Sequence, residues 1–197
     1  MLTKKGAMFG LDARIALAIF GALSVISGAA LYSAIESSKA TALVNQISEI
    51  NNAYEQYLLD TGSHVRPTGV GANSYTVKAG DLVLNPGDVK GWNGPYISLE
   101  INPADIGSKR YLVYKDYLVT FHRIKKGISF TIPSASGFEC LVGDECELWL
   151  SIKGIDKQLA SQIDIIIDGS VNLDSGNLRY IDSSKELEKR IIMNYTW

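Results

Sequence analysis

Two hydrophobic patterns follow one another in the first 60 or so residues of this chain. Residues 15–35, IALAIFGALSVISGAALYSAI, form a charge-free apolar run. At about 1.5 Å per residue in a helix, such a run spans the roughly 30 Å of bilayer hydrocarbon. Beyond it, apolar residues recur at steps of three and four, at Ala40, Leu43, Ile47, Ile50, Tyr54 and Tyr57. That spacing places them on one stripe of a helix.

Together these patterns predict one long helix from about residue 12 to residue 60, with a membrane segment at about 15–35. Gly62 supplies the stop signal at its C-terminal end. We expect the first half of this helix to span a membrane and the striped second half to pack against a folded domain.

Charge indicates the orientation of the membrane segment. Lys4, Lys5 and Arg14 precede it, and Glu36 follows it. Under the positive-inside rule, the N-terminus lies in the cytoplasm and the chain after Tyr32 lies outside. The length of 197 residues and the net charge of −2 fit one domain plus a long helix, without bulk nucleic-acid binding or disorder.

The remaining elements are short. Residues 62–95 are rich in Gly, Pro, Asn and Asp, which predicts an irregular connection. The segments RYLVY, YLVTFHRI and ISFTI, at 110–114, 117–124 and 128–132, predict an antiparallel meander that covers the 43–57 stripe. A helix is expected over about 156–167, and the tail at 183–197 suits either an amphipathic helix or a last strand. The predicted fold class is therefore α+β, a long N-terminal helix packed on an antiparallel β-sheet.

The two cysteines, Cys140 and Cys146, lie close together in the part placed outside. In an oxidising compartment such a pair indicates a short-loop disulfide, and two unrelated buried thiols are the alternative. The disulfide agrees with the topology that the charges indicate.

Other polar residues give no catalytic pattern. His122, Arg123, Lys125 and Lys126 form a basic cluster at a predicted hairpin end, which we interpret as a solvated turn rather than a DNA-binding patch. No nucleophile or metal motif accompanies a histidine, so we predict that the chain is not an enzyme and uses no cofactor.

Three aspartates near the end of the second predicted helix are the candidates for a metal site. Asp164 and Asp168 lie one helical turn apart, and Asp174 lies in the following turn. Oxygen ligands of this kind bind Ca²⁺, but their spacing is not that of an EF-hand loop. A solvated helix end is the favoured interpretation, and no metal site is predicted.

The segment KKGA-MFGLD-ARIALAIFGALSVISGAALYSAI resembles the cleavage and assembly signal of type IV pilins and type II secretion pseudopilins. In that family a basic leader ends in a small residue, usually Gly. A prepilin peptidase cuts there and methylates the new N-terminus, and a carboxylate occupies the fifth mature position. A cut after Ala7 makes Met8 the first mature residue and Asp12 the fifth, with Gly21 at a helix glycine of the family. Cuts after Gly6 or Gly10 are the alternatives.

The sequence also departs from the family pattern, with Ala7 in place of Gly, Asp12 in place of Glu, and Arg14 close to the apolar run. In the globular part, Trp92-Asn93-Gly94-Pro95-Tyr96 resembles a segment of the major pseudopilins. For Trp92 and Tyr96 we favour packing against the long helix.

The resemblance implies a leader at 1–7, a long helix at 8–61 and a periplasmic or extracellular αβ domain at 62–197. It implies that the Asp12 carboxylate of an incoming subunit pairs with the Met8 ammonium of its neighbour, which lessens the cost of both charges near hydrocarbon. The implied partners are the prepilin peptidase, copies of the chain, other pilin-like subunits and the assembly machinery of a bacterial inner membrane.

Two other interpretations of the N-terminus remain. A signal peptide would be cut at a small-x-small site such as Ser27 and Ala29, although the apolar run is longer than the usual one. A membrane-anchored periplasmic binding module that never polymerises would leave Asp12 without a role.

Overall fold

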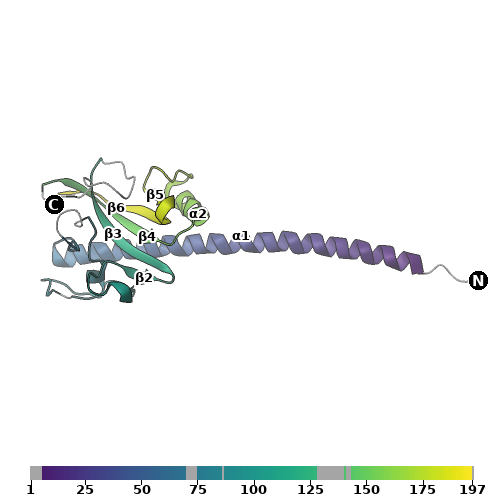
Figure 1. The fold of residues 1–197 in the computed structure, drawn as a ribbon, viewed down its shortest axis with the longest axis horizontal. Helices are drawn as coiled ribbons and strands as arrows, with labels where there is room; N and C mark the ends of the chain where they lie inside the picture. Colours follow the sequence, from purple (N-terminus) through teal and green to yellow (C-terminus); the bar gives the residue numbers. More distant parts are fainter. Residues whose placement is uncertain (1–5, 70–74, 86, 128–139, 141–142, 197) are drawn as a thin grey trace, which may run out of the picture. The chain divides into compact units, whose positions relative to one another are not determined.

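A computed structural model describes residues 6–69, 75–85, 87–127, 140 and 143–196 of the chain (Figure 1). The chain divides into two compact units, Met1–Lys39 and Ala40–Trp197. Helix α1, Gly6–Thr61, contributes residues to both units. The expectation of an α+β fold with a long N-terminal helix on an antiparallel sheet is confirmed.

The part of α1 in the first unit is apolar and exposed. Leu17 is 70 %, Phe20 71 % and Val25 73 % exposed. By length and composition, this helix is able to cross a membrane. The helix of 56 residues is about 84 Å long and begins earlier than the sequence pattern indicated.

The part of α1 in the second unit is the centre of its hydrophobic core. Every member of the predicted stripe is buried, and Ile50, Tyr54 and Tyr57 are completely so. Glu49 and Glu55 lie on the exposed side. The helix ends where Gly62 adopts a φ of 65° and its N–H donates to the Leu58 carbonyl at 2.9 Å. The stripe and the stop signal are therefore confirmed.

Six strands form one antiparallel sheet in the order β1-β2-β3-β4-β6-β5. Their bounds are β1 Glu100–Ile101, β2 Leu112–Tyr114, β3 Tyr117–Lys125, β4 Glu145–Lys153, β5 Leu178–Ile181 and β6 Glu186–Thr196. The strands predicted at 110–114 and 117–124 are present, and the one predicted at 128–132 falls outside the described residues. For the tail, the strand alternative is the correct one, because β6 pairs with both β4 and β5.

The two faces of the sheet have different chemistry. Because side chains alternate along a strand, β3 directs Phe121 to the core, where its ring lies 5.3 Å from that of Tyr54 on α1. Thr120 and His122 therefore point to the opposite face, where Ser151 of β4 and Glu188 of β6 lie beside them. All four of these polar residues are buried.

A second helix, α2 at Lys157–Asp168, has a clear start and end. The Asp156 carboxylate accepts from the Leu159 N–H at 2.9 Å, and Gly169 ends the helix with a φ of 79°. Leu159 and Ile163 join the core. The helix predicted at about 156–167 is confirmed. Short 3₁₀ helices at Ala79–Leu82, Pro103–Asp105 and Asp182–Ser184 complete the described elements.

Candidate functional site

The residues that the sequence assigns to cleavage and assembly all lie in the first unit, on α1. Ala7 and Met8 are in its first turns, and Asp12 follows one turn later. Asp12 and Arg14 are both exposed. Positions two apart on a helix do not face each other, and within the described chain no ion pair or hydrogen bond involves Asp12. The geometry therefore gives no support to neutralisation of Asp12 by Arg14 within the same chain.

Gly21 lies on an open part of the helix surface. A Cβ built at Gly21 would have no neighbour within 4 Å, and the same holds at Gly28. Neither glycine is required by packing within the chain, although each costs helix stability relative to alanine. Such positions let a second helix approach closely in lipid.

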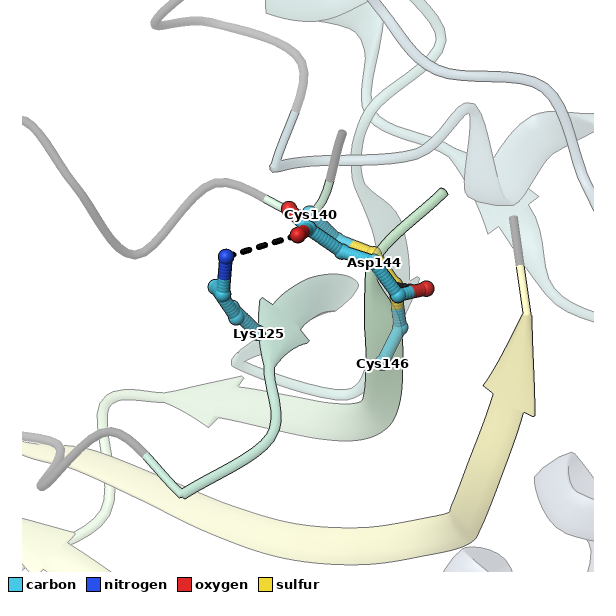
Figure 2. Close-up of a disulfide and its surroundings, with 4 residues drawn as sticks. All are labelled: Lys125, Cys140, Asp144 and Cys146. Atoms are coloured by element: carbon cyan, nitrogen blue, oxygen red, sulfur yellow. Dashed lines mark hydrogen bonds and ion pairs between the residues drawn. A yellow bond between two sulfur atoms is a disulfide. The ribbon is translucent and has the colours of Figure 1, made fainter. Parts of the chain in front are cut away.

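The expected disulfide is present and joins Cys140 to Cys146 at the start of β4, with the two Cα atoms 5.8 Å apart (Figure 2). Beside it, the Lys125 ammonium lies 2.6 Å from the Asp144 carboxylate. The disulfide thus closes the short segment that leads into β4, and the ion pair joins that segment to the end of β3.

The prediction of a solvated turn is wrong for two members of the basic cluster, His122 and Arg123. His122 and Arg123 are 5 % and 1 % exposed, because β3 extends past them to Lys125. Lys125 and Lys126 are at the surface, where they pair with Asp144 and Glu145. The four residues therefore do not make one positive patch.

Two of the three aspartates around the end of α2, Asp164 and Asp168, organise the loop that follows the helix. The Asp168 carboxylate accepts hydrogen bonds from the Asn177 N–H at 2.8 Å, the Asn177 amide at 3.0 Å and the Leu178 N–H at 3.1 Å. Asp164 is fully buried and accepts from the Asn172 N–H at 2.6 Å. A solvated helix end is therefore wrong for Asp164, which turns into the loop that follows the helix.

The electrostatics of the two helix aspartates differ. Burial raises the pKa of Asp164, which has a single hydrogen bond from Asn172 to oppose it. Burial also acts on Asp168, but the hydrogen bonds from Asn177 and Leu178 outweigh it and lower the pKa of that carboxyl. Asp174 is exposed. Among the described residues these three carboxylates do not converge on a common point where a cation could sit.

The aromatic segment after the irregular connection packs against α1, as expected. The Tyr96 ring meets that of Tyr57 edge-on at 5.7 Å, and its hydroxyl donates to the Asp60 carboxylate at 3.0 Å. Trp92 packs on Tyr96 and donates its indole N–H to the Asp81 carbonyl at 2.8 Å. This segment fixes the C-terminal end of α1 to the domain.

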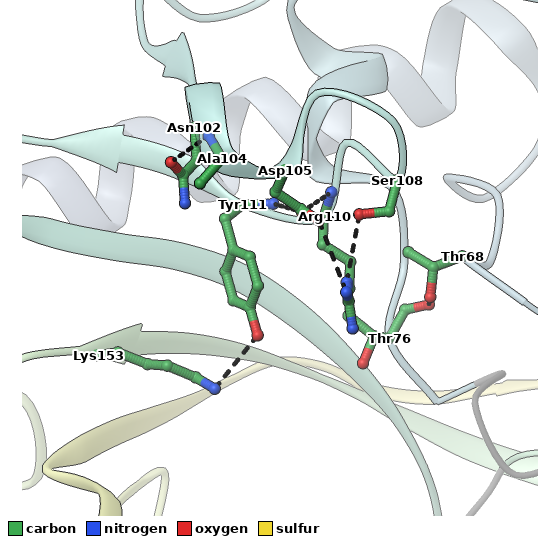
Figure 3. Close-up of polar contacts among 9 residues, drawn as sticks. All are labelled: Thr68, Thr76, Asn102, Ala104, Asp105, Ser108, Arg110, Tyr111 and Lys153. Carbon is green, nitrogen blue, oxygen red and sulfur yellow. Dashed lines mark hydrogen bonds and ion pairs between the residues drawn. The ribbon is translucent and has the colours of Figure 1, made fainter.

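Asp105, in the following loop, also has a structural role. Its carboxylate accepts from the Ser108 hydroxyl and from the N–H groups of Arg110 and Tyr111 (Figure 3). Burial opposes ionisation of this group, but these hydrogen bonds and the Arg110 charge lower the pKa of Asp105. The carboxylate therefore holds its own turn.

Sequence reasoning missed a group of ionisable residues inside the domain. His122 of β3 and Glu186 and Glu188 of β6 are all buried, and ligand atoms of the three lie within 4.8 Å of one another. The alternation of Glu186, Glu188 and Arg190 in the tail was the available signal, but it is equally typical of a solvent-facing strand edge.

Comparison with known proteins adds no family assignment: no family model, curated protein or solved structure has significant similarity to this chain.

Proposed function

We propose that this chain is a pilin-like filament subunit, anchored in a membrane by the first half of α1 and assembled through that helix. The supporting observation is the change of burial along a single helix. Residues around Phe20 are apolar and exposed, whereas Ile50 and its stripe neighbours form the core of the folded unit. A helix with one half built for burial in its own domain leaves the other half for a different apolar environment.

Asp12 supplies the specificity in this proposal. A carboxylate next to an apolar helix surface is costly in hydrocarbon unless a cation pairs with it. Removal of residues 1–7 would create an ammonium on Met8, one turn before Asp12, on every copy. Pairing Asp12 of one copy with Met8 of the next would satisfy both charges and would fix the axial stagger of neighbouring subunits.

Small residues would allow the helices to come close. Gly21 and Gly28 leave open positions on the helix surface, and close approach in lipid depends on such positions. The folded unit would remain outside the membrane, where the Cys140–Cys146 disulfide is chemically stable. The proposed location is the inner membrane of a bacterium, followed by a periplasmic or surface filament.

An Asp12→Ala variant tests the assembly role in the native host. We expect it to be produced, membrane-inserted and cleaved like the wild type, but to yield little sheared filament. A Glu49→Ala variant is the matched control, because Glu49 is an exposed carboxylate of the same helix. Its filament yield should equal that of the wild type.

If the Asp12→Ala variant polymerises normally, the assembly role proposed for Asp12 is wrong. If the wild type itself yields no filament in its native host, the filament proposal fails, and the chain is better described as a membrane-anchored periplasmic binding module, the other function considered for this sequence.

A further inference from the structure

The sheet face opposite the core carries a compact group of acid and base side chains. His122 is on β3, Ser151 is on β4, and Glu186 and Glu188 are on β6. In the strand register Thr120 pairs with Ser151, and Ser151 pairs with Glu188. His122 and the two glutamates therefore converge across the central strand of the sheet.

These side chains are buried, and two of them have polar atoms without a hydrogen-bond partner among the described residues. His122 is 5 %, Glu186 3 % and Glu188 0 % exposed. Within the described chain, both carboxylate oxygens of Glu188 and Nδ1 of His122 lack a hydrogen-bond partner. His122 Nδ1 and Glu188 Oε1 are 3.3 Å apart, but they are not aligned for a hydrogen bond. Buried charges are normally paired, hydrogen-bonded or bound to a metal.

Among the described residues, no lysine or arginine forms an ion pair with Glu188. Lys153 lies 3.7 Å from the Glu186 carboxylate and donates to the Tyr111 hydroxyl at 3.3 Å (Figure 3). Arg179, the cross-strand neighbour of Glu188, has its guanidinium stacked 4.7 Å from the ring centre of Trp149. Among the described residues, Glu186 thus forms an ion pair with Lys153 and accepts from the Ser151 hydroxyl, whereas the ion pair of Glu188 is with the imidazole of His122.

The spacing of the three groups suits a small metal ion. Ligands about 2.0–2.1 Å from a tetrahedral zinc ion lie about 3.3–3.4 Å from one another. The separation of 3.3 Å between His122 Nδ1 and Glu188 Oε1 matches that edge length. A Glu186 oxygen lies within 4.8 Å of both, so Glu186 is close enough to be the third ligand.

We propose that His122, Glu186 and Glu188 form a binding site for a divalent transition-metal cation of the zinc class. One imidazole nitrogen and two carboxylates are a donor set that Zn²⁺ accepts, with a water molecule or the Ser151 hydroxyl left to fill the fourth position. The cation would bind Oε1 of Glu188 and would join β3 to β6 across β4.

The site does not depend on the filament role of the chain, because all of its ligands lie in the second unit, 40–197. It is also separate from the aspartates near the end of α2, which already serve as hydrogen-bond acceptors for backbone N–H groups.

The test uses the full chain, purified in detergent, stripped with EDTA and incubated with ZnCl₂. We expect about one equivalent of retained zinc, and a rise in Tm of about 5–10 °C at a zinc concentration 100-fold above Kd. Replacing zinc with Co²⁺ should give the visible absorption bands of a tetrahedral nitrogen–oxygen site. A wild-type protein that retains only trace zinc and shows no shift in Tm would overturn the proposal.

Two variants identify the ligands. Glu188→Gln removes the buried charge while keeping the side-chain shape, so the metal-free variant should fold at least as well as the metal-free wild type. It should nevertheless lose the retained zinc and the rise in Tm, and His122→Gln should do the same. Zinc retention by both variants at the wild-type level would refute the assignment.

The matched control is His64→Gln, which removes the other histidine of the chain. His64 lies beside Tyr54, with its ring nitrogen 3.1 Å from the Tyr54 hydroxyl, and it does not belong to the group of His122, Glu186 and Glu188. This variant should retain zinc like the wild type. If it loses the zinc while His122→Gln keeps it, the bound metal lies elsewhere and the proposed site is wrong.

Discussion

Removing the Asp168 carboxylate should loosen the loop between α2 and β5. This group accepts three hydrogen bonds, two of them from the backbone N–H groups of Asn177 and Leu178. Gly176 fits closely against it, since a Cβ there would be 2.5 Å from the Asp168 oxygen. Hydrogen bonds to a charged group contribute about 1.5–3 kcal/mol each when buried, but this site is partly exposed and the three bonds share one acceptor. We therefore expect Asp168→Ala to lower the free energy of unfolding by about 2–3 kcal/mol.

The pH dependence gives a second signature of the same interaction. The folded pKa of Asp168 lies below the unfolded value of about 3.9. The contribution of the Asp168 carboxylate to the free energy of unfolding is therefore complete above the unfolded pKa and is lost as the pH falls through the folded pKa. Asp168→Asn should remove that part of the acid sensitivity and should already be destabilised at neutral pH.

Urea denaturation of the full chain in detergent, followed by tryptophan fluorescence, measures both effects. Asp174→Ala is the matched control, because that exposed side chain should change stability by less than about 0.5 kcal/mol. Calcium should not change the stability of the wild type or of the Asp168→Ala variant. An unchanged stability of Asp168→Ala would refute the loop role, and a calcium-dependent rise in the wild type that Asp168→Ala abolishes would instead support a calcium site.

Three further predictions concern the folded unit. Ile50→Ala should cost about 2–5 kcal/mol of unfolding free energy because this side chain is fully buried, whereas Leu59→Ala, at a position 82 % exposed, should cost less than about 0.5 kcal/mol. Replacing Cys140 and Cys146 by serine should cost about 2 kcal/mol, and a reductant should then lower the denaturation midpoint of the wild type only. Tyr57→Phe should be neutral or slightly stabilising in the same assay, because the buried hydroxyl has no hydrogen-bond partner among the described residues.

The long helix was predictable because its patterns are local. A charge-free run and a stripe at steps of three and four are visible in the sequence, and Gly62 marks the end through a backbone conformation that glycine adopts readily. The second helix was predictable for the same reason, with Asp156 as its cap. In both cases the residues that decide the element lie within a few positions of one another.

The polar face of the sheet was not predictable from the sequence in the same way. His122 and Glu188 are 66 positions apart, and they meet only because β6 adds to β4 beside β3. Alternation in a strand shows which residues share a face, but not whether that face is covered. For this reason the sequence pattern predicts a solvated turn at His122 and Arg123 and does not mark Glu186 and Glu188 as buried candidates.

The aspartates at the end of α2 illustrate a related difficulty. Their spacing indicates a shared side of a helix, and such carboxylates are equally suited to water, calcium or backbone N–H groups. The partner that these carboxylates take depends on the loop at 169–177, whose N–H groups turn toward Asp164 and Asp168. Long-range loop geometry of this kind is not encoded in a local pattern.

The central claim, that this chain is processed into a filament subunit, is tested most directly by the intact mass of the protein from its native host. The proposal predicts a chain without residues 1–7 that begins with N-methylated Met8. The proposal would be contradicted if the protein from the membranes of its native host retained residues 1–7. It would also be contradicted if the chain were cut near Ala29 and released in soluble form.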